Sequence, residues 1–143
     1  MKRHEETLTE VRSVYADLSR QPLTRNCLRR TECCQFRLTG KVPQLTRGEA
    51  LLAAHAFRAT GRKSLPLPPD GACPMLRNDT HKCLIYESRP FGCRTHFCQA
   101  AGGPIERREV LALIRRLEKV DFEMGGDGPH PLPQAMTQAL GEL

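Results

Sequence analysis

Seven cysteines constrain this chain more than any other feature of its sequence. They form two groups separated by about forty residues: Cys27, Cys33 and Cys34, then Cys73, Cys83, Cys93 and Cys98. Most stand in polar, proline-rich stretches where a hydrophobic core is not expected, so burial as small apolar side chains does not explain the set. Thiolates from distant segments that converge on a metal would explain it, because metal binding then contributes to folding.

The composition agrees with a small core that needs additional support. The chain has 143 residues, of which 39% are hydrophobic and 5% aromatic, with eleven glycines and eleven prolines. This length corresponds to one domain. We therefore predict a single cysteine-cluster metal-binding domain over residues 1–143, with its core motif at residues 27–98.

The sequence also predicts a cellular compartment. No run of about 18 apolar residues occurs, so no membrane span and no membrane partner are expected. The first ten residues, MKRHEETLTE, lack the apolar stretch of a secretory signal. We therefore expect a cytoplasmic protein, in which cysteines stay reduced. An odd set of seven then favours metal or redox chemistry over a disulfide framework.

The charge pattern gives a weaker indication about partners. The net charge is +6, and residues 1–63 hold 13 basic and 6 acidic side chains. A basic region can bind nucleic acid. Here, however, the charges are scattered among other residues and are not interleaved with aromatic side chains. Nucleic-acid binding is therefore not expected, and a protein partner stays an open alternative.

Apolar periodicity predicts a mainly α-helical fold in which three to four helices frame a loop-built cysteine site. The expected helices span about residues 4–20, 47–60, 103–121 and 134–140. Tyr15 belongs to the apolar stripe of the first. Thr46 and Glu49 form a capping-box pattern before the second. The apolar run Leu84–Tyr86 predicts a strand, and at most one short strand pair is expected.

The spacing of the cysteines bears on the metal. No C-x2-C pair occurs, which weakens the ordinary zinc-finger interpretation. Iron–sulfur clusters are also bound by thiolates and accept less regular spacings. An iron–sulfur cluster with a redox role is therefore the first hypothesis. A zinc-binding structural or interaction module is the alternative. His81 and His96 are further candidate ligands for the site, although a solvated loop position is the more common role of such histidines.

Basic residues accompany the cysteines along the sequence. They are Arg29, Arg30, Lys82, Arg89 and Arg94. Nearby cations favour thiolates and offset the negative charge of a thiolate cage. We predict that Arg89 and Arg94 are the cofactor-binding residues among them.

The segment from Cys83 to Arg94 has the pattern C-x-I-Y-x-x-R-P-x-x-C-R, with Cys73 upstream. Chiefly on this pattern, residues 27–94 resemble the CxxCxxCC family, also called YkgJ-like, a cysteine-cluster family described as zinc- or iron-chelating. It implies bound zinc or an iron–sulfur cluster, without an agreed reaction. A flagellin lysine methylase is related to the family, so a cluster-dependent methyltransferase-like enzyme, or its accessory protein, is a second alternative.

One position departs from the family motif. Arg30 stands where the motif has its second cysteine, so the first segment supplies three thiols. We expect Cys98 to replace the missing ligand, because it is the unassigned thiol nearest to the end of the motif. All seven cysteines are thus predicted metal ligands. Patterns such as G-x-S-x-G and H-E-x-x-H are absent, so no catalytic residue is assigned.

Overall fold

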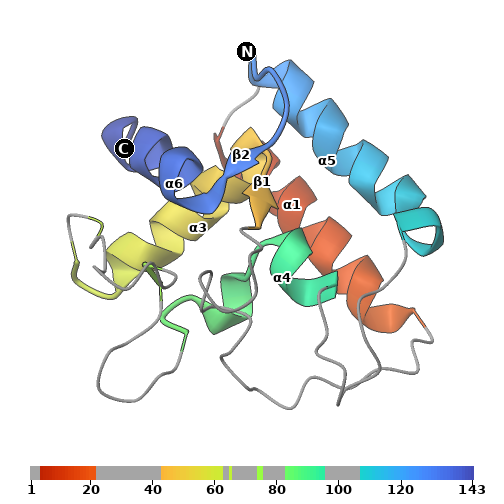
Figure 1. The fold of residues 1–143 in the computed structure, drawn as a ribbon, viewed down its shortest axis with the longest axis horizontal. Helices are drawn as coiled ribbons and strands as arrows, with labels where there is room; N and C mark the ends of the chain where they lie inside the picture. The colour runs from red at the N-terminus through yellow and green to blue at the C-terminus, as the bar shows by residue number, and fades with distance from the viewer. Residues whose placement is uncertain (1–3, 22–42, 63–64, 66–73, 76–82, 96–106) are drawn as a thin grey trace.

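The computed structural model describes residues 4–21, 43–62, 65, 74–75, 83–95 and 107–143 (Figure 1). Two of the predicted metal ligands, Cys83 and Cys93, lie in this part. The predicted site residues that lie outside it are Cys27, Cys33, Cys34, Cys73 and Cys98, together with His81 and His96.

The described part is mainly helical, as the sequence predicts. Its α-helices are α1 (His4–Arg20), α3 (Arg47–Ala59), α4 (Phe91–Thr95), α5 (Leu111–Glu123) and α6 (Leu132–Gly141). Two 3-10 helices, η2 (Tyr86–Ser88) and η4 (Arg107–Glu109), precede α4 and α5. Among the described residues, no helix combines the length and hydropathy that a membrane span requires.

The first two predicted helices are confirmed almost to the residue. The apolar stripe of α1 is buried, including Val11 and Val14. α3 begins after Thr46, whose backbone N–H and hydroxyl group donate to Oε2 of Glu49 at 3.1 and 3.0 Å. The predicted capping box is therefore present and fixes where α3 starts.

Two other helix starts differ from the sequence prediction. The third predicted helix was expected from about residue 103; residues 103–106 lie outside the described part, and within it α5 begins at Leu111, after the 3-10 turn of η4. Val110 has φ −127° and ψ 16°, which separates the 3-10 turn of η4 from α5. α6 begins at Leu132, before the expected residue 134, because a proline, here Pro133, is tolerated in the first turn of a helix.

The predicted strand at Leu84–Tyr86 is wrong. The N–H group of Leu84 donates to the carbonyl of Met75 at 2.8 Å, and the chain then turns into η2. The apolar run reflects the burial of Ile85 in the core rather than a strand. The observed sheet instead pairs β1 (Gln44–Leu45) with β2 (His130–Pro131) in antiparallel register.

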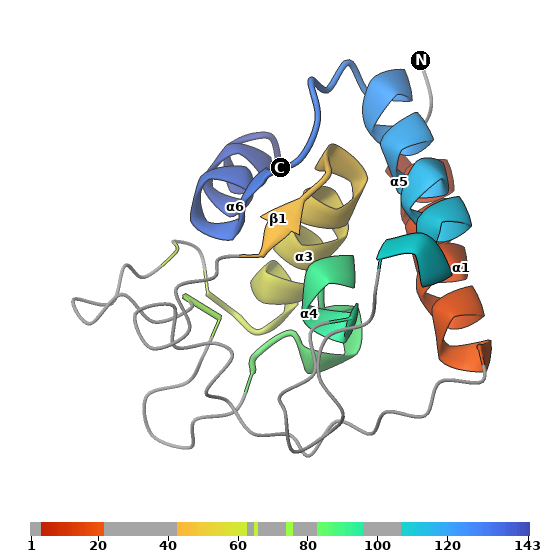
Figure 2. The same cartoon turned by 45° about the vertical axis from the view of Figure 1, so that its right-hand side comes forward.

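Two hydrophobic clusters share α3, which lies between α6 and the α1–α5 pair (Figure 2). The α3–α6 cluster includes Phe57, Met75, Ile85 and Met136. The α1–α3–α5 cluster includes Val14, Leu51, Phe91 and Leu117. α3 is therefore the central helix of the described part, and both cysteine-bearing segments pack close to it.

Candidate metal centre

The two described cysteines are half-buried and lie beside different parts of the core. Cys83 packs against the α3–α6 cluster. Cys93 lies in α4, two residues after Phe91, whose ring belongs to the α1–α3–α5 cluster. Within the described part, no three Cys, His, Asp or Glu side chains gather as a metal site. The described part therefore contains two of the seven predicted ligands. Cys83 lies beside the α3–α6 cluster, and Cys93 follows a residue of the α1–α3–α5 cluster.

The turn that carries Cys93 begins at a buried proline. Pro90 is fully buried, and its carbonyl accepts hydrogen bonds from the N–H groups of Cys93 and Arg94 at 3.0 and 3.2 Å. A proline fixes its own φ and disfavours helical geometry at the residue before it. α4 therefore begins directly after Pro90, and Cys93 lies in its first turn.

A buried carboxylate holds the start of the same turn. Glu49 is 2% exposed, and its Oε1 accepts hydrogen bonds from the N–H of Phe91 at 2.7 Å and from the hydroxyl of Tyr15 at 3.0 Å. Its Oε2 accepts the two bonds from Thr46. One side chain thus joins α3 to α1 and α4. Burial raises the pKa of Glu49, and the hydrogen bonds that it accepts oppose this shift.

Arg94, the residue after Cys93, folds back over α1. Its guanidinium carbon lies 4.1 Å from the centre of the Tyr15 ring, a cation–π distance. Its Nε and Nη2 donate to the carbonyls of Arg89 and Glu87, both at 2.7 Å. Arg94 therefore fastens the segment before α4 to α4 itself and to α1.

The Tyr15 phenol acts as a fixed hydrogen-bond donor in this network. Burial raises its pKa well above the ordinary value, and the Glu49 carboxylate raises it further, whereas the charge of Arg94 opposes both. The phenol therefore stays protonated at neutral pH. The sequence indicated Tyr15 only as a packing residue and Glu49 only as a cap. A hydroxyl on an otherwise apolar stripe and a carboxyl within an apolar helix are the signals that could have linked them.

The contacts of Arg94 refine its predicted role. Two of its nitrogens bind backbone carbonyls of the motif, so this side chain shapes the segment that carries Cys93. An ionised Cys93 would also attract the guanidinium. Cofactor binding by Arg89 and Arg94 stays a prediction.

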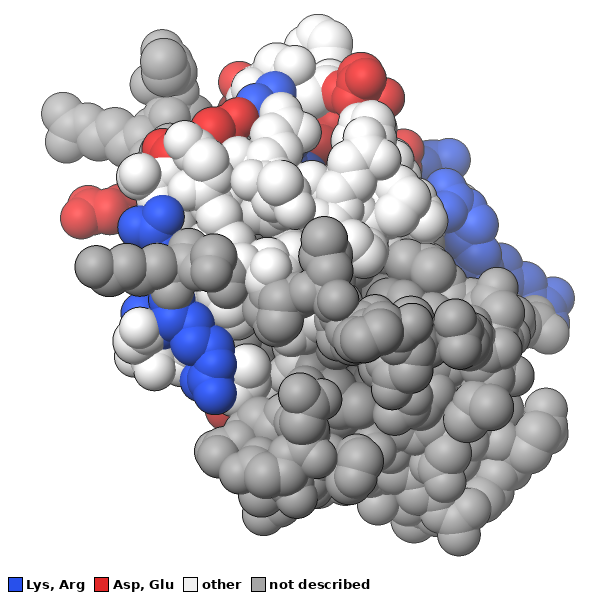
Figure 3. All heavy atoms as spheres, turned by 60° about the vertical axis from the view of Figure 1, so that its left-hand side comes forward, with Lys and Arg blue, Asp and Glu red and all other residues white. Residues whose placement is uncertain are grey.

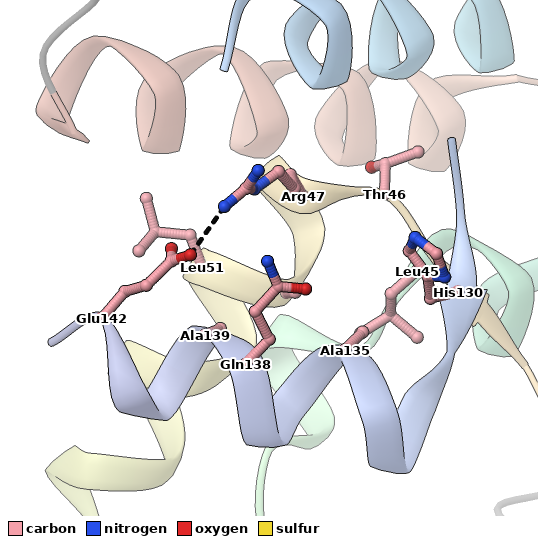
Figure 4. A pocket seen from close by; sticks show the side chains of 10 residues that line it. Leu45, Thr46, Arg47, Leu51, His130, Ala135, Gln138, Ala139 and Glu142 are labelled. Atoms are coloured by element: carbon pink, nitrogen blue, oxygen red, sulfur yellow. Dashed lines mark hydrogen bonds and ion pairs between the residues drawn. The ribbon is translucent and has the colours of Figure 1, made fainter. Parts of the chain in front are cut away.

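A shallow hollow lies between the start of α3 and α6, and Arg47 and Glu142 form an ion pair of 2.6 Å across it (Figure 4). His130 and Gln138 also line it. No cysteine is among the described residues that line this hollow.

Comparison with known proteins identifies the class to which these features belong. Residues 25–115 match the model of the CxxCxxCC family, described as "Putative zinc- or iron-chelating domain". The match spans more than half of the chain, and the chain therefore belongs to the CxxCxxCC family. No curated protein and no solved structure matches it.

Proposed function

We propose that this protein binds an iron–sulfur cluster through cysteine thiolates and uses it in electron transfer. The proposed ligands come from Cys27, Cys33, Cys34, Cys73, Cys83, Cys93 and Cys98. The observation that carries the proposal is the family membership, together with the way that the core presents Cys83 and Cys93 at half-buried positions. Thiolates are the ligands that iron–sulfur clusters use, so the donor chemistry fits.

The surroundings of Cys93 support a thiolate site. Arg94, the residue after Cys93, is anchored by two carbonyls and a ring, so its positive charge is held in a fixed place close to the turn that carries Cys93. A cluster bound by four thiolates carries negative charge, which nearby cations offset. The irregular cysteine spacing favours a polynuclear cluster over a single zinc ion. When bound, such a cluster would supply one-electron chemistry.

The described basic residues give little support to nucleic-acid binding. Arg116 pairs with Glu10 and Asp17, and Arg47 pairs with Glu142. Figure 3 shows a face on which uncharged side chains separate the Lys and Arg groups. We therefore propose no nucleic-acid partner. We also propose a cytoplasmic location, where thiolate ligands stay reduced.

Metal analysis and a visible spectrum of anaerobically purified protein test the proposal. We expect iron with acid-labile sulfide, and visible absorption that bleaches on reduction. Cys83→Ser and Cys93→Ser should each lower the iron content, whereas Thr137→Ala, at an exposed position of α6, should leave it unchanged.

A colourless anaerobic preparation would overturn the iron–sulfur assignment. Stoichiometric zinc, with unfolding after chelation, would establish the structural zinc module instead. A preparation that folds without metal and takes up neither iron nor zinc would refute metal binding altogether.

A further inference from the structure

The helix that carries Cys93 depends on tertiary contacts. α4 has five residues, and a helix of that length is not stable by itself in water. Its neighbours hold it instead: β1 lies against it (Figure 1), and Phe91 is buried in the α1–α3–α5 cluster. The position of Cys93 is therefore set by whatever fixes the two sides of this short turn.

Two sets of contacts, here called tethers, hold the two sides of the turn, and both end at Oε1 of Glu49. On the N-terminal side, the N–H of Phe91 donates to Oε1 of Glu49 at 2.7 Å. On the C-terminal side, Arg94 lies on the ring of Tyr15, whose hydroxyl donates to the same Oε1 at 3.0 Å. Glu49 thus holds the turn that carries Cys93 from both sides.

We propose that Glu49 is a positioning residue for metal binding, which presets the Cys93 thiol by holding both ends of its helical turn. The proposal rests on the proposed function, because it assumes that Cys93 is a ligand. Residues that orient metal ligands without touching the metal typically change metal affinity by about 10- to 100-fold when mutated. Preorganisation has this effect because the turn is then ordered during folding rather than at the moment of binding.

The chain offers a matched control in Asp121. This residue is 4% exposed, and its carboxylate also bonds to the start of α3, through the N–H of Arg47 at 2.8 Å. Its other oxygen accepts from the N–H of Gly128 at 2.9 Å. Asp121 and Glu49 therefore are both buried carboxyl groups that bond at the start of α3, but the described contacts of Asp121 do not include α4. Asp121→Asn therefore controls for the replacement of a buried carboxyl group by an amide, and urea unfolding measures how far the stability costs of the two substitutions differ.

The experiment measures Zn²⁺ affinity of the reduced apo-protein by competition with a chromophoric chelator, and the thiolate-to-metal absorption of the Co²⁺ form. Glu49→Gln should weaken Zn²⁺ binding by about 10- to 100-fold and alter the Co²⁺ spectrum. Asp121→Asn should stay within about threefold of the wild type and keep its spectrum, because its bonds do not reach α4. Urea unfolding of each variant shows whether the two amides cost similar stability.

Two further variants keep the test decisive if Glu49→Gln folds poorly. Tyr15→Phe removes one tether and leaves the ring beneath Arg94, so we expect a loss of a few-fold in Zn²⁺ affinity. In a Cys93→Ser background, Glu49→Gln should cause little additional loss, because a double-mutant cycle shows coupling when one residue acts through another.

The outcomes separate the two proposals. A wild type that binds neither Zn²⁺ nor Co²⁺ refutes the proposed metal-binding function and, with it, the positioning role. Normal binding by the wild type with equal affinities for Glu49→Gln and Asp121→Asn overturns the positioning role alone. An undiminished effect of Glu49→Gln in the Cys93→Ser background also overturns it, because Glu49 would then act through some other group.

Discussion

Two buried carboxylates, Glu49 and Asp121, bind the same end of α3 but join it to different regions. Glu49 connects α3 with α1 and the turn that carries Cys93. Asp121 connects α3 with α5 and with the turn before β2, through Arg47 and Gly128. The comparison shows that the start of α3 is held twice, once for the cysteine region and once for the C-terminal region. Perturbations of the two regions should therefore be separable.

The two carboxyl groups also differ in the kind of hydrogen-bond donor that they bind. The partners of Glu49 include two side-chain hydroxyls, whereas Asp121 accepts two backbone N–H groups, one at the start of α3 and one in a glycine-rich turn. Gly125 and Gly128 have φ of 78° and 108°, a region that other residues rarely adopt. The contacts of Glu49 near the Cys93 turn thus require particular side chains, the hydroxyls of Tyr15 and Thr46. The contacts of Asp121 near the C-terminal region require glycines that can adopt positive φ.

The largest expected effect comes from removing the Glu49 acceptor. Glu49→Ala leaves buried donors of Tyr15, Phe91 and Thr46 without their partner, and each unsatisfied group costs about 1–3 kcal/mol. We expect the free energy of unfolding to fall by about 3–5 kcal/mol in urea titrations. Asp121→Ala, with fewer described donors, should cost less. A larger loss for Asp121→Ala would reverse the comparison.

Crowding the Asp121 side gives the next effect. A Cβ atom on Gly126 would lie 2.5 Å from both carboxylate oxygens of Asp121, so Gly126→Ala must displace that side chain. Overpacking of this kind costs about 1–3 kcal/mol. Gly141→Ala is the control, because a Cβ there meets nothing within 4 Å. Differential scanning calorimetry should show a lower Tm for Gly126→Ala only, and equal Tm values would contradict the crowding argument.

A smaller effect is expected from Tyr15→Phe. The substitution deletes one hydrogen bond to Glu49, worth about 1 kcal/mol, and preserves the ring that supports Arg94. Chemical denaturation should therefore show a modest loss, well below that of Glu49→Ala. A loss equal to that of Glu49→Ala would mean that the hydroxyl, rather than the carboxylate, organises this side.

The smallest effect concerns a half-buried ion pair between α1 and α5. The hydrogen bond from Arg116 lowers the pKa of Asp17 in the folded state. This pair therefore stabilises the fold above the unfolded pKa of Asp17, and the contribution is lost as the pH falls through the folded pKa. Asp17→Asn should reduce the difference in stability between pH 7 and pH 3, more clearly at low salt. Glu6→Gln, at an exposed position of α1, is the control, and an equal change there would remove the assignment to Asp17.

Local sequence patterns were sufficient to predict α1 and α3, because an apolar stripe and the Thr46–Glu49 cap are formed by residues close together in the sequence. The same patterns gave a wrong strand at Leu84–Tyr86, because a short apolar run that buries Ile85 has the same sequence pattern as a short strand. The start of α5 was missed because the break at Val110 has no local signature. The pairing of β1 with β2 joins residues more than eighty positions apart, which periodicity does not report.

In the candidate site, too, the sequence predicted the local motif but not the contacts made between helices. The motif from Cys83 to Arg94 was evident from its spacing, since a motif is local by nature. The hydrogen bonds that join Tyr15 and Phe91 to Glu49 could not be predicted from the sequence, because they depend on how α1, α3 and α4 pack. Of the seven predicted ligands, only Cys83 and Cys93 are among the described residues, so the full ligand set stays a prediction.

The packing of α6 against α3 bears on the order in which the chain folds as it is synthesised. Met136, Ala139 and Leu140 complete the cluster against which Cys83 packs, and they are made last among the residues of that cluster. At about 5–20 residues per second, Cys83 leaves the ribosome several seconds before its supporting surface exists. With Cys83 as a ligand, as proposed above, the surface that supports this thiol is complete only after translation of α6, and we expect metal capture at this cysteine to follow that step.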